Sequence, residues 1–306
     1  MQSATIPADP AHELEGYARV ARTRGRVRAA CDPFVTRLTR RAFLTGLATA
    51  GVGAATGVGA HGYLYGRHAL HTTAATLPVA GLPAALSGLR IGLLTDVHRS
   101  RWVTADDVAA AVKLLMDARP DLIVLGGDYV TWGDRRYVGP AAEALAPLSA
   151  PHGVFAILGN HDDDRETAAE FDRRGLQVLR DARTRLTIRN ETVELAGIRF
   201  WTRRTSDVAA VIGNAGGTVI LLAHDPRRFV EAQRLKLPLV LSGHTHGGQV
   251  VLPVLGAIAA QKFPVLAGIG RRDNTTMFVS RGLGTVYLPV RVNCPPEVAV
   301  LTLQSA

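Results

Sequence analysis

The sequence predicts an α/β domain in which two packed, mixed β-sheets lie between layers of helices. The first observation is alternation, because short apolar runs and amphipathic helical patterns follow one another from residue 90 to residue 223. The second is a change of pattern at residue 239, after which the predicted elements are mostly strands. With 47% apolar residues, the roughly 220 residues after the N-terminal segment are enough to bury the core of one domain.

The predicted strands are short apolar or alternating runs bounded by glycine, proline and polar residues. Five of them end in side chains that are common metal ligands, and these are 90–95, 122–125, 154–158, 219–223 and 239–241. The other predicted strands are 186–188, 192–195, 198–201, 249–252, 276–280 and 297–303.

Four helices are predicted between these strands. The clearest covers residues 104–118, where Thr104 is in the N-cap position, Asp107 is in the capping-box position and apolar residues recur on one face. The others cover residues 140–148, 164–174 and 206–214.

The N-terminal segment has the layout of a twin-arginine export signal. Arg40 and Arg41 stand directly before Phe43-Leu44 and a weakly apolar, glycine-rich run. An ordinary basic flank before a short transmembrane anchor is the alternative, and the one cleavage candidate, Thr73-Ala74-Ala75, is weak. The predicted organisation is a basic n-region at 1–41, an apolar signal or anchor at 42–66, a linker at 67–88 and a globular domain at 89–306.

This layout predicts where the protein works. We expect export by the twin-arginine machinery to the periplasm or to the outer face of the cytoplasmic membrane, with residues 42–66 as the anchor if they are not cleaved. Membrane contact is then expected as well.

Positive charge is concentrated in the N-terminal segment. Residues 1–68 hold nine Lys or Arg and four Asp or Glu, which accounts for just over half of the net charge of +9. The rest is mildly basic and has no Lys/Arg run with interleaved aromatics, so nucleic acid is not an expected partner. Cys31 and Cys294 lie on opposite sides of the apolar run, so no disulfide is expected inside the globular domain.

Five predicted strands end in residue types that bind metals, at the sheet edge where α/β proteins bind ligands. The residues at these ends are Asp96, His98, Asp128, Asn160, His224, His244 and His246. Each one alone has an ordinary interpretation, as a capping or turn aspartate, a left-handed asparagine or a core histidine. Five such strand ends in one chain instead predict a metal site.

The seven side chains provide eight ligand positions for two divalent ions when the Asp128 carboxylate bridges both. One predicted set is Asp96, His98, Asp128 and His246, and the other is Asp128, Asn160, His224 and His244. Mixed imidazole, carboxylate and amide ligands favour Mn, Fe or Zn over Ca. Two such ions can hold a hydroxide between them and clamp a phosphoryl group for in-line displacement.

The strand-end motifs follow a defined order: Asp96-Val97-His98, Gly127-Asp128, Gly159-Asn160-His161-Asp162, His224 and Gly243-His244-Thr245-His246. This order resembles the calcineurin-like metallophosphoesterase superfamily. Later segments, Val250–Pro253, Val279–Gly284 and Pro295–Glu297, resemble its bacterial cell-envelope branch, which includes twin-arginine-exported phosphodiesterases and UDP-2,3-diacylglucosamine hydrolases. The resemblance covers residues 89–303 and implies a four-layer αββα sandwich.

We therefore expect a metal-dependent phosphoric ester hydrolase that cleaves a phosphodiester or pyrophosphate by means of a metal-bridging hydroxide. Its expected substrate is a cell-envelope or lipid-linked phosphoester. His161 is the predicted catalytic residue, because it adjoins the ligand Asn160 and can stabilise transition-state charge or protonate the leaving oxygen. Asp162 is predicted to orient the His161 imidazole.

Two alternatives stay open at this point. One is a phosphatase for a soluble nucleotide or monoester, and the other is an envelope-anchored binding protein with a relic site, although a relic would have lost a ligand. The nearly all-apolar stretch Val250–Ile269 bears on the substrate. It is either a core strand with a packed loop or a lip that receives acyl chains or touches the bilayer.

Overall fold

The computed structural model describes residues 39–257 and 262–306. Contacts divide the chain into two units, Met1–Ala48 and Thr49–Ala306, and the sheets belong to the second. Helix α1 (Arg40–Leu64) is 25 residues long. Within the described residues, Arg40–His68 is the one stretch long and apolar enough to cross a membrane, a test that signal sequences also meet.

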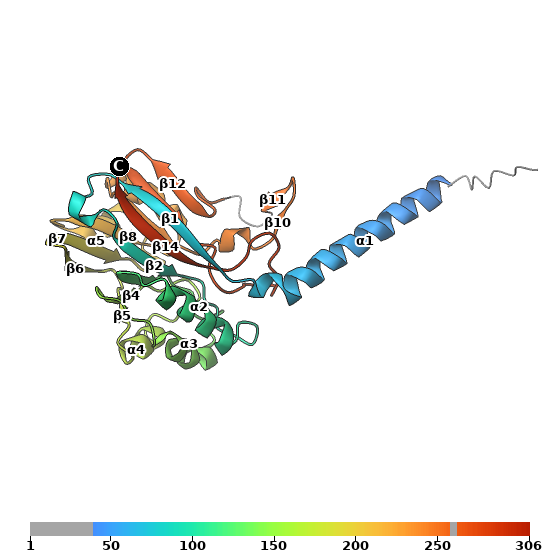
Figure 1. The fold of residues 1–306 in the computed structure, drawn as a ribbon, viewed down its shortest axis with the longest axis horizontal. Helices are drawn as coiled ribbons and strands as arrows, with labels where there is room; N and C mark the ends of the chain where they lie inside the picture. Colours follow the sequence, from blue (N-terminus) through green and yellow to red (C-terminus); the bar gives the residue numbers. More distant parts are fainter. Residues whose placement is uncertain (1–38, 258–261) are drawn as a thin grey trace, which may run out of the picture. The chain divides into compact units, whose positions relative to one another are not determined.

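The first sheet has six strands in the order β1-β14-β2-β3-β4-β5 (Figure 1). Strands β2 to β5 run parallel, β14 pairs antiparallel with β2, and β1 pairs parallel with β14, so the sheet is mixed. Its strands are β1 (His71–Val79), β2 (Arg90–Leu94), β3 (Leu122–Leu125), β4 (Val154–Ala156), β5 (Gln177–Val178) and β14 (Glu297–Ser305).

The second sheet is also mixed, with the order β12-β13-β9-β8-β7-β6. Its four central strands are parallel, and an antiparallel strand closes each edge. The strands are β6 (Ala182–Ile188), β7 (Glu191–Gly197), β8 (Thr218–Leu222), β9 (Leu239–Ser242), β12 (Gly268–Arg272) and β13 (Thr275–Val279). A separate hairpin joins β10 (Val251–Leu252) to β11 (Gly256–Ala257).

Helices cover the outer face of each sheet (Figure 1). Over the first sheet lie α2 (Ala105–Asp117), α3 (Val138–Leu145) and α4 (Glu166–Asp172), and over the second lie α5 (Thr205–Ile212) and α6 (Phe229–Arg234). The single-turn 3-10 helices are η1 (Gly66–His68), η2 (Ala84–Leu86), η3 (Arg135–Tyr137), η4 (Pro226–Arg228) and η5 (His246–Gly248). Thr104 caps α2 in a capping box with Asp107, as predicted.

The alternation of side chains along β3 shows how the layers form. Leu122 and Val124 face the core between the sheets, whereas Ile123 and Leu125 face the core under the helices. On the far side, Leu221 of β8 packs with Phe229 of α6. The result is the four-layer αββα sandwich that the sequence predicts.

Two of the predictions about secondary structure were wrong. Residues 67–88 are not a linker, since they contain β1, whose Leu77 and Val79 are fully buried. Strand β1 is ordered by pairing with β14, more than 200 residues away, so its local composition gives no signal. The predicted strand 198–201 is a turn, because the chain leaves the sheet after Ile198 donates its N–H to the carbonyl of Leu222.

Candidate metal centre

The first cluster of metal-type ligands combines Asp96, His98 and His246, and all three are buried. Asp96 and His98 follow β2, and His246 begins η5 after β9. Their ligand atoms all lie within 4.8 Å of one another. The φ angles are 52° for Asp96, 48° for His98 and 51° for His246, a left-handed backbone that turns the side chains inward at a cost in strain.

The second cluster combines Asp128, His224 and His244, whose ligand atoms also lie within 4.8 Å of one another. They follow β3, β8 and β9, so this cluster joins the two sheets. Asp128 reaches both clusters, because its Oδ2 lies 3.0 Å from His224 Nε2 and 3.6 Å from His98 Nε2. The carboxylate that the sequence predicts to be shared thus lies between the two groups of histidines.

Glycines allow the backbone to come this close to the ligands. A Cβ on Gly159 would collide with the Asp128 carboxylate, and a Cβ on Gly243 would collide with that of Asp96. Thr95 donates its hydroxyl to the Asp96 carboxylate, and the backbone N–H of His244 donates to it as well. The glycines that flank the motifs are therefore needed for packing.

Burial keeps most of these histidines neutral. It lowers the pKa of His98 to about 3 and that of His244 to about 4, and it lowers the pKa of His246 well below its ordinary value. For His224 burial also lowers the pKa, but the Asp128 carboxylate outweighs it and raises the pKa to about 10. Three imidazoles thus offer lone pairs at neutral pH, the form that binds metals, and a cation would displace the His224 proton.

An unpaired atom shows whether this site fits metal ions. Asn160 Oδ1 is buried and has no hydrogen-bond partner among the described residues, although buried polar atoms nearly always have one. In the first cluster, the Nε2 atoms of His98 and His246 converge to 3.1 Å. Imidazole nitrogens and carboxylates gathered in two clusters, with Asn160 lining the same cavity, form a donor set that fits divalent ions of the Mn, Fe or Zn type.

Comparison with known proteins agrees with this geometry. The profile of the calcineurin-like phosphoesterase family matches residues 89–248. The chain belongs to this family. It is accordingly a metal-dependent phosphoesterase, with two buried His/Asp clusters as its metal site.

Three relatives illustrate the range of this family. An uncharacterised metallophosphoesterase of Bacillus subtilis, YkuE, is 30% identical over 285 residues, which are 88% of this chain and 99% of the relative. The phosphodiesterase YaeI of Escherichia coli is 32% identical over 70% of this chain and 82% of its own length. A Danio rerio transmembrane protein with a metallophosphoesterase domain is 31% identical over 75% of this chain and 56% of its own length.

In this phosphoesterase, His161 lies beside both clusters and is 6% exposed. Its ring centroid is 5.0 Å from that of His98 and 4.6 Å from that of Trp132. The backbone N–H of Trp132 donates to His161 Nδ1 over 2.9 Å, so a neutral His161 carries its proton on Nε2. Burial lowers its pKa, which favours this neutral form.

Asp162 does not orient His161, and this prediction was wrong. Its buried carboxylate instead accepts from the backbone N–H groups of Asp128, Tyr129 and Gly159, at 2.8, 2.8 and 2.9 Å. These N–H groups lie in the turns after β3 and β4, where no strand partner satisfies them. Asp162 therefore holds together the two turns that carry Asp128 and Asn160.

A cavity of about 370 Å³ opens onto the second cluster and onto His246 of the first. Asp128, Asn160, His161, His244 and His246 line its polar part. Its remaining walls are mostly apolar, and they include Val250, Phe263, Val286, Tyr287 and Leu288. The ring of Phe263 lies 5.4 Å from that of His244.

Sequence reasoning missed Trp132 and Arg291. Trp132 sets the tautomer of His161 through its backbone, which no side-chain motif reveals. Arg291 is buried, and its Nη2 lies 3.5 Å from His246 Nδ1. The one available signal was an arginine inside an apolar stretch, Val286–Val292.

Proposed function

We propose that this phosphoesterase hydrolyses a phosphodiester or pyrophosphate bond in a lipid-linked substrate of the cell envelope. The observation that carries the proposal is the apolar wall of the cavity over the second cluster. A phosphate monoester or a free nucleotide would gain little from such a wall. Apolar surface stabilises a bound acyl chain at about 25 cal/mol per Å² removed from water.

Large apolar side chains are also exposed at the rim of this cavity. Tyr287 and Leu288 line the cavity and are 78% and 65% exposed, and Leu255, in the turn of the β10–β11 hairpin, is 68% exposed. Large apolar side chains exposed together beside a polar reaction site mark a binding surface for an apolar group. For the stretch Val250–Ile269, this supports the lip rather than a packed core strand, although Ile258 lies outside the described residues.

In the proposed reaction, the seven predicted ligands would hold two divalent ions, which would supply an activated water and neutralise charge on the phosphoryl oxygens. The protein itself contributes a hydrogen bond from His161 Nε2, because its Nδ1 is already occupied by the Trp132 N–H. A neutral donor of this kind suits charge stabilisation in the transition state better than full transfer of a proton to the leaving oxygen.

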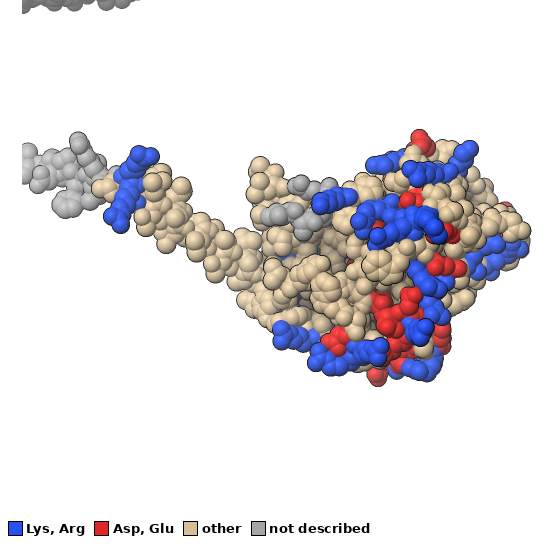
Figure 2. All heavy atoms as spheres, turned by 180° about the vertical axis from the view of Figure 1, so that it is seen from behind, with Lys and Arg blue, Asp and Glu red and all other residues tan. Residues whose placement is uncertain are grey.

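We also propose that the protein is exported by the twin-arginine route and stays attached to the outer face of the cytoplasmic membrane. Helix α1 carries no Lys, Arg, Asp or Glu except Arg40 and Arg41 at its N-terminal end, and Figure 2 shows one basic cluster on the visible face of this helix. Cleavage at Thr73-Ala74-Ala75 would cut β1 within its pairing to β14, which argues for an uncleaved anchor.

A parallel assay tests the substrate proposal. The full chain in detergent with Mn would be assayed on a lipid-linked UDP-sugar, a small chromogenic diester and a chromogenic monoester. We expect kcat/KM for the lipid-linked substrate to exceed that for the small diester by at least about tenfold, since burial of roughly 60 Å² of acyl surface suffices. Equal values, or preference for the monoester, would favour the soluble-substrate alternative.

Replacement of Arg40 and Arg41 by Lys tests the export proposal. The paired substitution should trap the precursor in the cytoplasm, as cell fractionation would show, because the export machinery reads the arginine pair itself. Arg26→Lys with Arg28→Lys is the matched control in the same basic leader and should leave export intact. Unchanged export of the first variant would indicate a plain membrane anchor.

A further inference from the structure

Arg291 is fully buried, and among the described residues its guanidinium has no carboxylate partner. Its N–H groups donate to backbone carbonyls instead. Nε and Nη2 both donate to the carbonyl of Gly284, and Nη1 donates to the carbonyl of Cys294 over 3.1 Å. Nη2 also donates to the carbonyls of Arg281, over 2.8 Å, and Gly282, over 3.1 Å. A buried cation held only by carbonyls is costly unless it organises those segments.

Residues 281–284, whose carbonyls accept hydrogen bonds from Arg291, pack directly against the first metal cluster. The N–H of Leu283 donates to the carbonyl of Thr95 over 3.0 Å, and the N–H of Gly284 donates to the carbonyl of Asp96 over 2.7 Å. Both acceptors lie in the turn after β2. A Cβ on Gly282 would collide with the Asp96 side chain, and one on Gly284 would collide with that of His98. Displacement of residues 281–284 would therefore displace two of the three ligands.

Arg291 also touches the third ligand. Its Nη2 lies 3.5 Å from His246 Nδ1, but the two Nη2 protons are used by nearer carbonyls, so this is a packing contact. The contact limits rotation of the His246 ring without fixing its tautomer. No such contact links Arg291 to the described residues of the second cluster.

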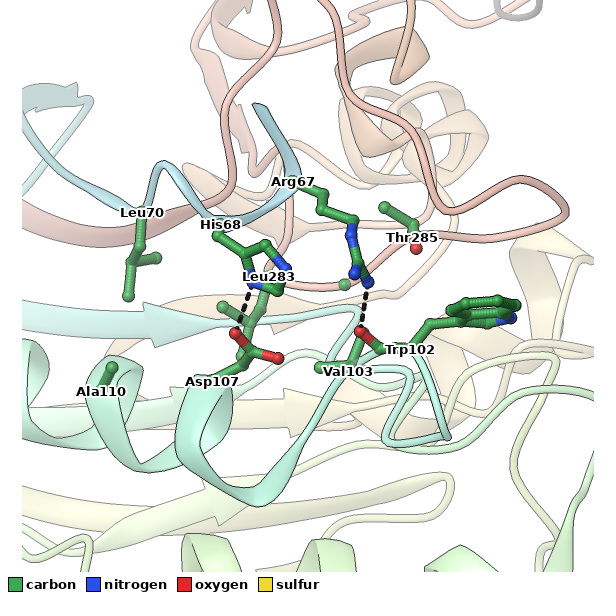
Figure 3. Close-up of a pocket in the computed structure, with 10 residues that line it drawn as sticks. Arg67, His68, Leu70, Trp102, Val103, Asp107, Ala110, Leu283 and Thr285 are labelled. Carbon is green, nitrogen blue, oxygen red and sulfur yellow. Dashed lines mark hydrogen bonds and ion pairs between the residues drawn. The ribbon is translucent and has the colours of Figure 1, made fainter. Parts of the chain in front are cut away.

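The backbone of Arg291 in turn packs on the C-terminal end of α1. Its N–H donates to the carbonyl of Gly62 over 3.2 Å, and a Cβ on Gly62 or on Gly66 would collide with the Arg291 carbonyl. Figure 3 shows the neighbouring contacts that residues 67 and 68, just after α1, make with the globular domain. Arg67 donates to the carbonyl of Trp102 over 2.7 Å, and His68 Nδ1 lies 2.8 Å from Asp107 Oδ1, around a small pocket that Leu283 and Gly284 also line.

We propose that Arg291 is a positioning residue for the first metal cluster and that it couples this cluster to the end of α1. Helix α1, the proposed membrane anchor, then also supports the metal site. Perturbation at residues 62–66 reaches Asp96, His98 and His246 through Arg291 and residues 281–284, whereas the second cluster is spared.

Metal binding by Arg291→Met tests the positioning role. The full-length variant would be titrated with Mn against a competing chelator, and its bound metal counted by mass spectrometry. We expect one ion to bind as in the unaltered protein and the other about 10- to 100-fold more weakly, the usual cost of losing a residue that supports a ligand. Arg228→Met is the matched control, since Arg228 is buried and held by the Arg203 carbonyl and Glu231, away from the first cluster.

A second substitution in Arg291→Met shows which ion is affected. Because His246→Ala already disables the first cluster, adding Arg291→Met to it should cause little further loss of metal. His244→Ala disables the second cluster, so adding Arg291→Met to it should weaken the remaining ion. Two ions bound at unaltered affinity by Arg291→Met, or equal weakening of both, would overturn the assignment.

Gly66→Ala tests the coupling and keeps the proposal falsifiable if Arg291→Met does not fold. Its methyl group would press on the Arg291 carbonyl, so we expect the same ion to bind several-fold more weakly. Gly66 begins η1 just after α1, and Gly57→Ala in α1 is the control, because a Cβ there meets nothing within 4 Å. Unchanged affinity in Gly66→Ala would show that the junction of α1 and η1 does not act on the metal centre.

Discussion

The two metal clusters are built from similar side chains but stand in different surroundings. The first, with Asp96, His98 and His246, is enclosed by tight glycine contacts and by the buried Arg291 guanidinium. The second contains Asp128 and His244, which line the open cavity, although His246 of the first cluster lines it too. Asp96 and His98 are thus enclosed by protein, while Asp128, His244 and His246 face the cavity.

Two neighbouring metal clusters, both built at strand ends from the two sheets, are therefore supported in different ways. The enclosed cluster depends on packing contacts from distant parts of the chain, so we expect its ion to respond to changes in the scaffold. The open cluster borders His161 and the apolar wall, so we expect changes there to alter catalysis and substrate choice. Asp128 lies between the two clusters, so we expect its loss to affect both ions.

Asp128→Asn should have the largest effect. Loss of the shared negative charge should weaken both ions and lower kcat/KM by about 1000-fold, since several kcal/mol of charge stabilisation are lost. Metal content and steady-state rates would be measured together. Glu194→Gln, a buried carboxylate on β7 paired with arginines, is the control and should affect stability without loss of metal. Loss of only one ion from Asp128→Asn would rule out the shared role.

His161→Ala should separate catalysis from metal binding. Both ions should remain, while kcat falls by about 100- to 1000-fold, as for removal of one charge-stabilising donor. His152→Ala, on the turn before β4, serves as the control and should keep its activity. If His161→Ala lost an ion, His161 would have to be counted among the ligands.

Leu288→Asp should have the smallest effect, confined to one substrate class. A charge on the cavity rim should lower kcat/KM on the lipid-linked substrate by about tenfold and leave the small diester unaffected, because only remote binding energy is lost. Val230→Asp, on α6 and 36% exposed, controls for surface charge. A parallel fall on both substrates would mean that the rim supports the fold rather than the acyl chain.

Much of the fold was predictable because its signals are local. The buried strand Leu122–Leu125 and the capping box at Thr104 can be read from neighbouring residues, and both occur where they were expected. Strand β1 could not be read in this way, because among the described strands it pairs with β14 alone, more than 200 residues away in the sequence. Burial alternates from Thr73 to Val79, but the small and apolar residue types on the two faces are too similar for the sequence to show it.

The αββα layering, the family and the set of metal-type side chains could be predicted from the sequence, because alternating patterns, strand ends and glycine turns follow local rules. The contacts that support these side chains became visible in the folded chain. Asp162 binds backbone N–H groups instead of the His161 ring, the Trp132 backbone sets the His161 tautomer, and Arg291 spans the end of α1 and His246. Such contacts join segments far apart in the chain and depend on backbone atoms, which every residue carries alike, so no motif could have revealed them.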